Sequence, residues 1–277
     1  MNPILKVLQQ KRKIISCALI PFLTAGYPNI DLTIKALITL NLKGADIIEL
    51  GIPYSDALAD GPLIQKSSKI ALQQGTYINE VLYILSKVQY KLNAPIVIFT
   101  YYNPILVRGI HKFILEIVSM GVKGLIIPDL PIEEIDYLNQ LCFYYKIELI
   151  LFITPTNSFD RILEIISKAS SCIYLVSNTG VTGLRDYVNN DINILSNYIK
   201  SYTNKFLILG FGISSPIQVS QISAWNIDGI VMGSAFTGIL SSDFANKEST
   251  INIINNLGSF CKEIKTAIKD KKIMIEK

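Results

Sequence analysis

The sequence has very little histidine, no clustered cysteine and no long hydrophobic run. His111 is the only histidine among 277 residues, which excludes a metal centre built on several imidazoles. The four cysteines form neither a CxxC pair nor a metal-binding spacing, so we expect reduced, buried thiols and a reducing compartment. No apolar run reaches the ~18 residues of a membrane-spanning helix, although the mean hydropathy is +0.38. We therefore expect no membrane insertion and no metal.

The chain also lacks a basic block and a secretory signal. Its net charge of +4 is spread out, and no Lys/Arg cluster is interleaved with aromatic residues. This pattern favours small anionic ligands and gives no indication of nucleic-acid binding. Residues 1–13 have no long apolar core or small-residue cleavage site, and Ile4, Leu5 and Leu8 fall on one helical face. We expect a short helix packed on the main domain of a soluble intracellular protein.

What the chain does have is a regular alternation of short apolar runs and amphipathic segments. The runs are rich in β-branched residues, as in strands that are buried on both faces. The expected strands are residues 17–23, 46–50, 96–101, 124–128, 147–153, 173–177, 206–209 and 229–232. Helical spacing occurs between them, for example in residues 31–42, 110–120, 133–145 and 159–169.

This alternation predicts parallel strands joined by crossover helices. Roughly eight such units in a chain of this length indicate an α/β fold with a single (β/α)₈ TIM-barrel domain over residues 1–277. An open, doubly wound sheet is the alternative. The interval between Leu50 and Ile96 is too long for one crossover, so we expect a functional loop and an extra helix near residues 77–90, besides the extra helix at the N-terminus.

The segment DIIELGIPYSDALADGPLIQ, residues 46–65, carries two carboxyl groups in unlike settings. Glu49 lies inside an apolar run, where an ionised carboxylate is unfavourable. Asp60 follows in a loop rich in glycine and proline. Such a pair can divide acid and base roles between its members. The alternative is that Glu49 faces solvent at the strand end and that the aspartates only make turns.

Two glycine-containing loops suit a phosphate group. Residues 210–215, GFGISS, precede an expected helix, and Gly233 and Ser234 begin another. Glycine lets the backbone approach an anion, helix N-termini bind anions, and barrels commonly hold phosphate after strands seven and eight. Residues 177–183, SNTGVTG, suit a closing lid. The alternatives are tight turns and ordinary loop mobility; a dinucleotide site is disfavoured because Ser215 replaces the third glycine of the motif.

Aromatic residues near the expected strand ends could line a pocket for a flat apolar substrate. Each could equally belong to the barrel core. Asp129 and Asn103 lie at the same rim, as polar contacts or as supports for loops. The aromatic residues are Phe22, Phe99, Tyr101, Tyr174 and Phe211.

Several motifs in order resemble the tryptophan synthase alpha chain family. They are PFLTAGYP (21–28), ELGIPYSDALADGP (49–62), YYNP, IPDLP (127–131), YLVSNTGVTG (174–183), GFGIS (210–214) and GSA (233–235). The resemblance implies a (β/α)₈ barrel lyase that cleaves indole-3-glycerol phosphate to indole and glyceraldehyde 3-phosphate. It implies no cofactor in this chain. It also implies a partner beta chain, which holds pyridoxal phosphate and receives the indole, in an alpha2-beta2 tetramer.

The same resemblance assigns roles to individual residues. Glu49 would be the acid–base residue, Asp60 would bond the indole N–H, and Thr182 would belong to a lid that meets Asp60. Residues 53–60 and their surroundings would contact the beta chain. The indole pocket would be lined by Phe22, Phe99, Ile126 and Tyr174, and the phosphate would be held by Gly183, Phe211, Gly212, Gly233 and Ser234.

Two positions depart from the family pattern. Ala57 stands where the family usually has proline, and Asn178 stands where it usually has arginine. We expect a looser loop at Ala57, because proline restricts the unfolded chain. Without the arginine, lid closure and signalling to the beta chain lose one charge-assisted contact.

Three other functions remain open on the sequence alone. The chain could be a sugar-phosphate isomerase or epimerase, an enzyme that releases free indole without a partner, or a non-catalytic barrel that binds a phosphorylated ligand. A metal-dependent epimerase is disfavoured by the lack of histidine. The bias towards Ile, Asn, Lys and Tyr suggests an AT-rich genome, and hence a bacterial cytoplasm or a plastid stroma.

Overall fold

The strands close into one parallel barrel, as predicted. The computed structural model describes residues 1–177, 189–241 and 249–268. Neighbouring strands pair in chain order and β8 pairs back with β1, so the open-sheet alternative is wrong. The strands are β1 (Ala18–Thr24), β2 (Ile48–Gly51), β3 (Ile96–Phe99), β4 (Gly124–Ile126), β5 (Glu148–Ile153), β6 (Cys172–Val176), β7 (Phe206–Gly210) and β8 (Gly229–Met232).

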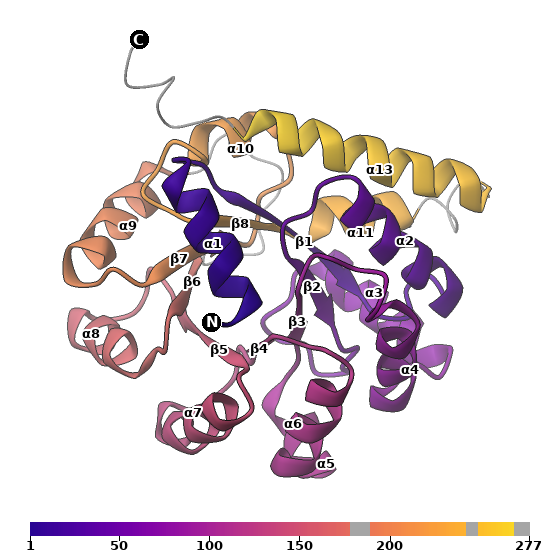
Figure 1. Cartoon of the computed structure of the whole chain (residues 1–277), viewed down its shortest axis with the longest axis horizontal. Coiled ribbons are helices and arrows are strands. Elements are labelled where there is room, and N and C mark those ends of the chain that lie inside the picture. Colours follow the sequence, from indigo (N-terminus) through magenta and orange to yellow (C-terminus); the bar gives the residue numbers. More distant parts are fainter. Residues whose placement is uncertain (178–188, 242–248, 269–277) are drawn as a thin grey trace.

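Helices surround the barrel (Figure 1). The expected extra helix near residues 77–90 is α4, and α3 fills the rest of that interval, which the sequence analysis did not foresee. None of the described helices has the length and apolarity to cross a bilayer. The helices are α1 (Pro3–Lys13), α2 (Ile30–Leu42), α3 (Pro62–Gln73), α4 (Ile78–Val88), α5 (Tyr102–Arg108), α6 (Ile110–Ser119), α7 (Ile135–Tyr144, after the 3₁₀ turn Ile132–Glu134), α8 (Phe159–Lys168), α9 (Asn190–Tyr202), α10 (Pro216–Ile222), α11 (Ser234–Leu240) and α13 (Thr250–Ala267).

Successive strand residues alternate between two apolar layers. On β1, Ile20 and Phe22 belong to the core inside the barrel, whereas Leu19 and Leu23 belong to the core between barrel and helices. This alternation follows from the two-residue period of a strand. It explains why the runs are apolar throughout, and it places alternate side chains such as Glu49 on the inner face.

Helix α1 closes the N-terminal end of the barrel. Its Ile4 and Leu8 are fully buried and belong to the inner core. Asn2 accepts a hydrogen bond from the Ile4 N–H (2.8 Å), and its amide donates to the carbonyl of Lys123 (2.8 Å). Arg12 donates two hydrogen bonds to the carboxylate of Asp228, at 2.7 and 2.8 Å. The helix is therefore a plug, and the open end of the barrel is the carboxyl end of the strands.

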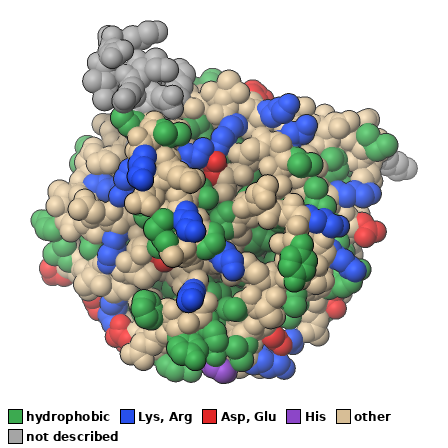
Figure 2. All heavy atoms as spheres, viewed as in Figure 1, with side chains coloured by type: hydrophobic (Ala, Val, Ile, Leu, Met, Phe, Trp, Pro, Cys, Tyr) green, Lys and Arg blue, Asp and Glu red, His purple; other side chains and the backbone are tan. Residues whose placement is uncertain are grey.

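The charge on the face that carries α1 is dispersed. Lys and Arg side chains on this face are interspersed among polar and apolar ones (Figure 2).

All four cysteines are free and buried, as expected.

Truncating the plug should destabilise the whole barrel. We expect Leu8→Ala to lower the free energy of unfolding by about 2–5 kcal/mol, because a buried side chain is lost and a cavity remains. Ile14→Ala is the control, since Ile14 is 60% exposed just beyond the helix. It should change the value by less than ~0.5 kcal/mol. Urea unfolding measures the free energy of unfolding of both variants. Equal losses in the two would contradict a stabilising role for α1 at the end of the barrel.

Candidate active site

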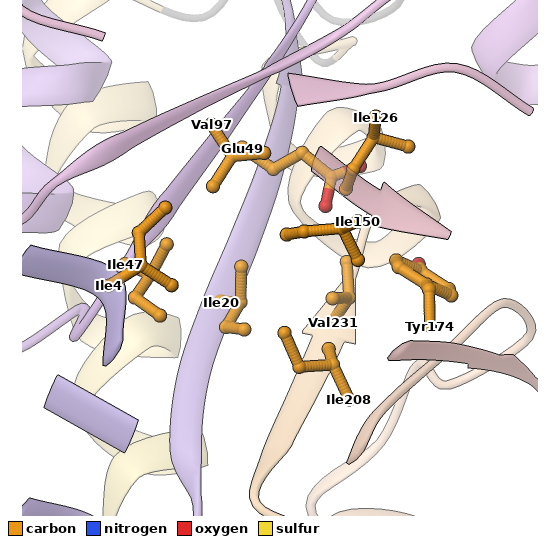
Figure 3. A pocket seen from close by; sticks show the side chains of 10 residues that line it. All are labelled: Ile4, Ile20, Ile47, Glu49, Val97, Ile126, Ile150, Tyr174, Ile208 and Val231. Atoms are coloured by element: carbon orange, nitrogen blue, oxygen red, sulfur yellow. The ribbon is translucent and has the colours of Figure 1, made fainter. Parts of the chain in front are cut away.

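Glu49 points into the barrel from the middle of β2. It pairs in register with Phe22 of β1 and Val97 of β3, and only 2% of it is exposed. The side chain extends into a ring of mostly aliphatic residues (Figure 3). The free space among them is about 10 Å³, room for about one water at most. The alternative of a solvent-facing Glu49 is therefore wrong. The ring consists of Ile4, Ile20, Ile47, Val97, Ile126, Ile150, Tyr174, Ile208 and Val231.

This environment keeps Glu49 protonated near neutral pH. Burial raises the pKa of the Glu49 carboxyl to about 8, and the negative charge of Asp60 adds to the effect. An unburied glutamate has a pKa near 4.5, so at pH 7 Glu49 is mainly a neutral carboxylic acid. It can donate a proton.

Asp60 lies in the loop after β2, in a less apolar setting. Its carboxylate accepts a hydrogen bond from the Tyr101 hydroxyl (3.1 Å), and that hydroxyl accepts one from the Ala59 N–H (3.1 Å). Burial raises the pKa of Asp60 to about 6, and the Tyr101 hydrogen bond opposes the rise. At pH 7 Asp60 is therefore mainly ionised. At pH 7 one carboxyl group is therefore mainly an acid and the other mainly an anion.

The loop that carries Asp60 is held in place although Ala57 replaces the family's proline. The Ala57 carbonyl accepts hydrogen bonds from the Gln65 side chain (3.0 Å) and from the Asp60 N–H (3.1 Å). The Ala57 methyl group is buried in the inner core. These contacts join the loop to α3, so a fixed path for Asp60 does not require proline.

Aromatic rings form two sides of the barrel mouth. Phe22 and Phe99 meet edge to face on one side, with ring centroids 5.7 Å apart. Tyr174 and Phe211 meet in the same way on the other side, at 5.8 Å. Ile126, predicted for the indole pocket, lies in the ring around Glu49. The structure thus brings the predicted pocket residues together around the mouth.

Two further aromatic residues of this mouth were not predicted from the sequence. Phe152 of β5 lies 4.7 Å from Tyr174 between ring centroids, and Tyr54 lies 5.0 Å from Tyr101. Strand alternation could have found Phe152, because it is two residues from the inward-facing Ile150. Tyr54 lies in an irregular loop, where no periodicity predicts its direction.

Glycines make room for two of these rings. A Cβ atom at Gly51 would lie 2.6 Å from the ring of Phe22, and one at Gly210 would overlap the Tyr174 hydroxyl. Both glycines lie at the carboxyl ends of their strands. Both glycines therefore leave space for an aromatic side chain, in addition to any turn that they form.

The two proposed phosphate loops differ in whether a side chain already caps the helix that follows. Phe211 and Gly212 both have positive φ, 72° and 73°, and a Cβ at Gly212 would meet no atom within 4 Å. The N–H groups of Ser214 and Ser215 donate to the Gln218 side chain, at 2.7 and 3.1 Å, so the start of α10 is already capped.

The start of α11 differs from that of α10. Gly233 is its N-cap and no side chain caps this end. Gly212, Gly233 and Ser234 are therefore better placed to contact an anion than the start of α10. Asn178, Thr182 and Gly183 lie outside the described residues.

Asp129 supports a loop. It accepts a hydrogen bond from the Tyr102 N–H (2.8 Å) at the start of α5. The Asn103 amide reaches the Tyr54 hydroxyl at 3.5 Å. No group of three or more potential metal ligands occurs within the residues that the structure describes.

The fold and this mouth together define a (β/α)₈ barrel enzyme with paired carboxyl groups at the carboxyl end of its strands. The family model for the tryptophan synthase alpha chain matches residues 8–269. The chain is 59% identical over 268 residues to the tryptophan synthase alpha chain of Gracilaria tenuistipitata var. liui, covering 97% of each chain. It is 44% identical to that of a Synechocystis species, covering 97% of this chain and 100% of the relative.

A solved structure agrees with these relatives. Tryptophan synthase subunit alpha from Legionella pneumophila superposes with a TM-score of 0.86 at 28% identity, covering 96% of this chain and 98% of that one. The chain therefore belongs to the tryptophan synthase alpha chain family, and it is an enzyme of tryptophan biosynthesis.

A buried neutral Glu49 predicts an unusual dependence of stability on pH. Its pKa in the folded chain lies above the ordinary value of 4.5, so the folded chain binds this proton more tightly than the unfolded chain. The contribution of Glu49 to stability therefore falls as pH rises from about 4.5 to about 8. Glu49→Gln should remove this fall and raise the free energy of unfolding by roughly 2–4 kcal/mol at pH 8.

The control for this prediction is Glu164→Gln. The Glu164 side chain is 44% exposed and pairs with Arg161 on the surface. Its urea unfolding should follow the wild-type pH dependence. A Glu49→Gln variant that keeps the wild-type dependence of stability on pH would contradict the raised pKa of Glu49.

Proposed function

We propose that this chain is a carbon–carbon lyase that cleaves indole-3-glycerol phosphate to indole and glyceraldehyde 3-phosphate. The observation that supports this most directly is the pairing of a mainly neutral Glu49 with a mainly ionised Asp60 at one apolar mouth. A protein that only bound a phosphorylated ligand would gain nothing from a buried carboxylic acid.

The reaction is a retro-aldol cleavage that needs one acid and one base. Glu49 donates its proton to indole C3, because indole leaves poorly as a carbanion. Glu49, now ionised, accepts the proton of the hydroxyl on the adjacent side-chain carbon. That carbon becomes the aldehyde carbon, the bond to C3 breaks, and its electron pair restores the aromatic indole. Glu49 ends the cycle protonated.

Asp60 stabilises the charge that develops in this step. Protonation at C3 places positive charge on the ring nitrogen. An ionised Asp60 beside the N–H offsets that charge in a site that excludes water, where such an interaction is strong. Gly212, Gly233 and Ser234 would hold the phosphate, so that binding energy from a remote group positions the reacting carbon. Tyr101 and the other aromatic side chains would enclose the ring.

We further propose that the indole passes to a beta chain that carries pyridoxal phosphate, in an alpha2-beta2 assembly. The loop of residues 53–60 lies at the barrel mouth, and Leu58 in it is 89% exposed. Because Leu58 projects from the segment that the family resemblance assigns to the beta-chain contact, it is the residue with which we test that contact. This chain would need no cofactor of its own.

The compartment we propose is the stroma of a red-algal plastid or a bacterial cytoplasm. Similar chains come from Gracilaria tenuistipitata and Synechocystis, a red alga and a cyanobacterium. In the plastid case we expect the gene on plastid DNA, and mapping the coding sequence to nuclear DNA would contradict a plastid-encoded chain.

Removing the Glu49 carboxyl group and removing the Asp60 carboxyl group should lower the rate of cleavage to different extents. Glu49→Gln should abolish indole release while indole-3-glycerol phosphate still binds, because the amide cannot transfer the proton. Asp60→Asn should lower kcat by several powers of ten, because the developing charge loses its counter-ion. Indole release and substrate binding by the isolated chain measure both, and turnover retained by Glu49→Gln would remove Glu49 from the mechanism.

Leu58→Asp should weaken activation by the beta chain, because a charge then replaces an apolar contact. The measurement is indole release with increasing beta chain, with the isolated variant as its own reference. Leu42→Asp is the control, since Leu42 is 73% exposed at the end of α2, outside the proposed interface. Equal activation of both variants would contradict the proposed contact.

A further inference from the structure

The Tyr101 hydroxyl links two neighbouring groups of the loop after β2. It is 3.1 Å from the Ala59 nitrogen and 3.1 Å from Asp60 Oδ2. A backbone N–H can only donate, so the hydroxyl accepts that hydrogen bond. Its own hydrogen is then available for Asp60. The geometry fixes the direction of the Tyr101–Asp60 hydrogen bond.

The ring of Tyr101 is itself held firmly. Only 3% of Tyr101 is exposed. Its ring meets Phe99 edge to face at 6.1 Å and lies against Tyr54 at 5.0 Å between centroids. It follows β3, whose Phe99 pairs with Gly51 at the end of β2. The hydroxyl is thus presented to the loop from the barrel wall.

No positive charge compensates Asp60 within the described residues. The described ion pairs do not include it, and Tyr101 provides the hydrogen bond that its carboxylate receives there. The titratable groups that act near it are Glu49 from β2, Tyr101 after β3 and Tyr174 from β6. Asp129 acts on Tyr101 from the next loop. None of these four can be a cation.

We propose that Tyr101 is a positioning residue that holds Asp60 as an oriented anion, beyond forming a wall of the indole pocket. The proposal rests on the proposed function, in which Asp60 must be charged while Glu49 stays neutral. Burial and the Asp60 charge raise the pKa of the Tyr101 hydroxyl well above its ordinary value, so the hydroxyl keeps its proton. The Tyr101 hydrogen bond lowers the pKa of Asp60 against the effect of burial.

The test compares Tyr101→Phe with Tyr54→Phe. Tyr101→Phe keeps the ring and removes the hydroxyl, so the acidic limb of the kcat/KM profile should move up by about one to two pH units. Tyr54→Phe also loses a hydroxyl beside Tyr101 but none that bonds Asp60, so its acidic limb should stay in place. A Tyr101→Phe profile that is lowered equally at every pH would overturn the proposal and leave Tyr101 a pocket wall.

A second measurement does not depend on turnover. The chain labelled with ¹³C at aspartate carboxyl carbons is titrated by NMR, and Asp60→Asn identifies the Asp60 signal. The Asp60 midpoint should rise by about one to two pH units in Tyr101→Phe and remain unchanged in Tyr54→Phe. An unchanged midpoint in Tyr101→Phe would overturn the proposal. Absence of indole release from wild type would instead overturn the proposed function, while this titration would still decide the role of Tyr101.

Discussion

The site depends on keeping one carboxyl group away from water. Glu49 lies on the inner face of β2, among aliphatic side chains that leave about 10 Å³ of free space. Transfer of an ionised carboxylate to such surroundings is unfavourable, so the group retains its proton and its pKa rises to about 8. The α1 plug contributes directly, because Ile4 belongs to the ring around Glu49 and helps to close that end of the barrel to water.

The second carboxyl group, Asp60, must instead be ionised, and it lies outside the apolar strand in the loop that follows. In this loop the Tyr101 hydroxyl donates a hydrogen bond to Asp60, and the Gln65 side chain on α3 donates one to the neighbouring backbone. The ionised Asp60 in turn favours the neutral form of Glu49. Asp60 thus supports the neutral state that Glu49 requires, and one strand with the loop after it provides both carboxyl groups.

Much of this could be predicted from the sequence. The period of apolar residues predicted every strand end to within about two residues, and the setting of Glu49 within an apolar run indicated its burial. The partner of Asp60 could not be predicted as such, because Tyr101 is 41 residues from Asp60 in the chain and follows a different strand. The capping of α10 was not predicted here, although Ser215 followed by Gln218 three residues later is the sequence pattern of a capping box.

The protonation state of Glu49 determines whether the site has an acid, and it can be measured directly. In chain labelled with ¹³C at glutamate carboxyl carbons, the signal that is lost in Glu49→Gln can be followed by NMR from pH 4 to pH 10. We expect a carboxyl that is mainly protonated at pH 7, with a midpoint near 8. A Glu49 signal that is already fully ionised at pH 6 would contradict it, because no acid would then be available for indole C3.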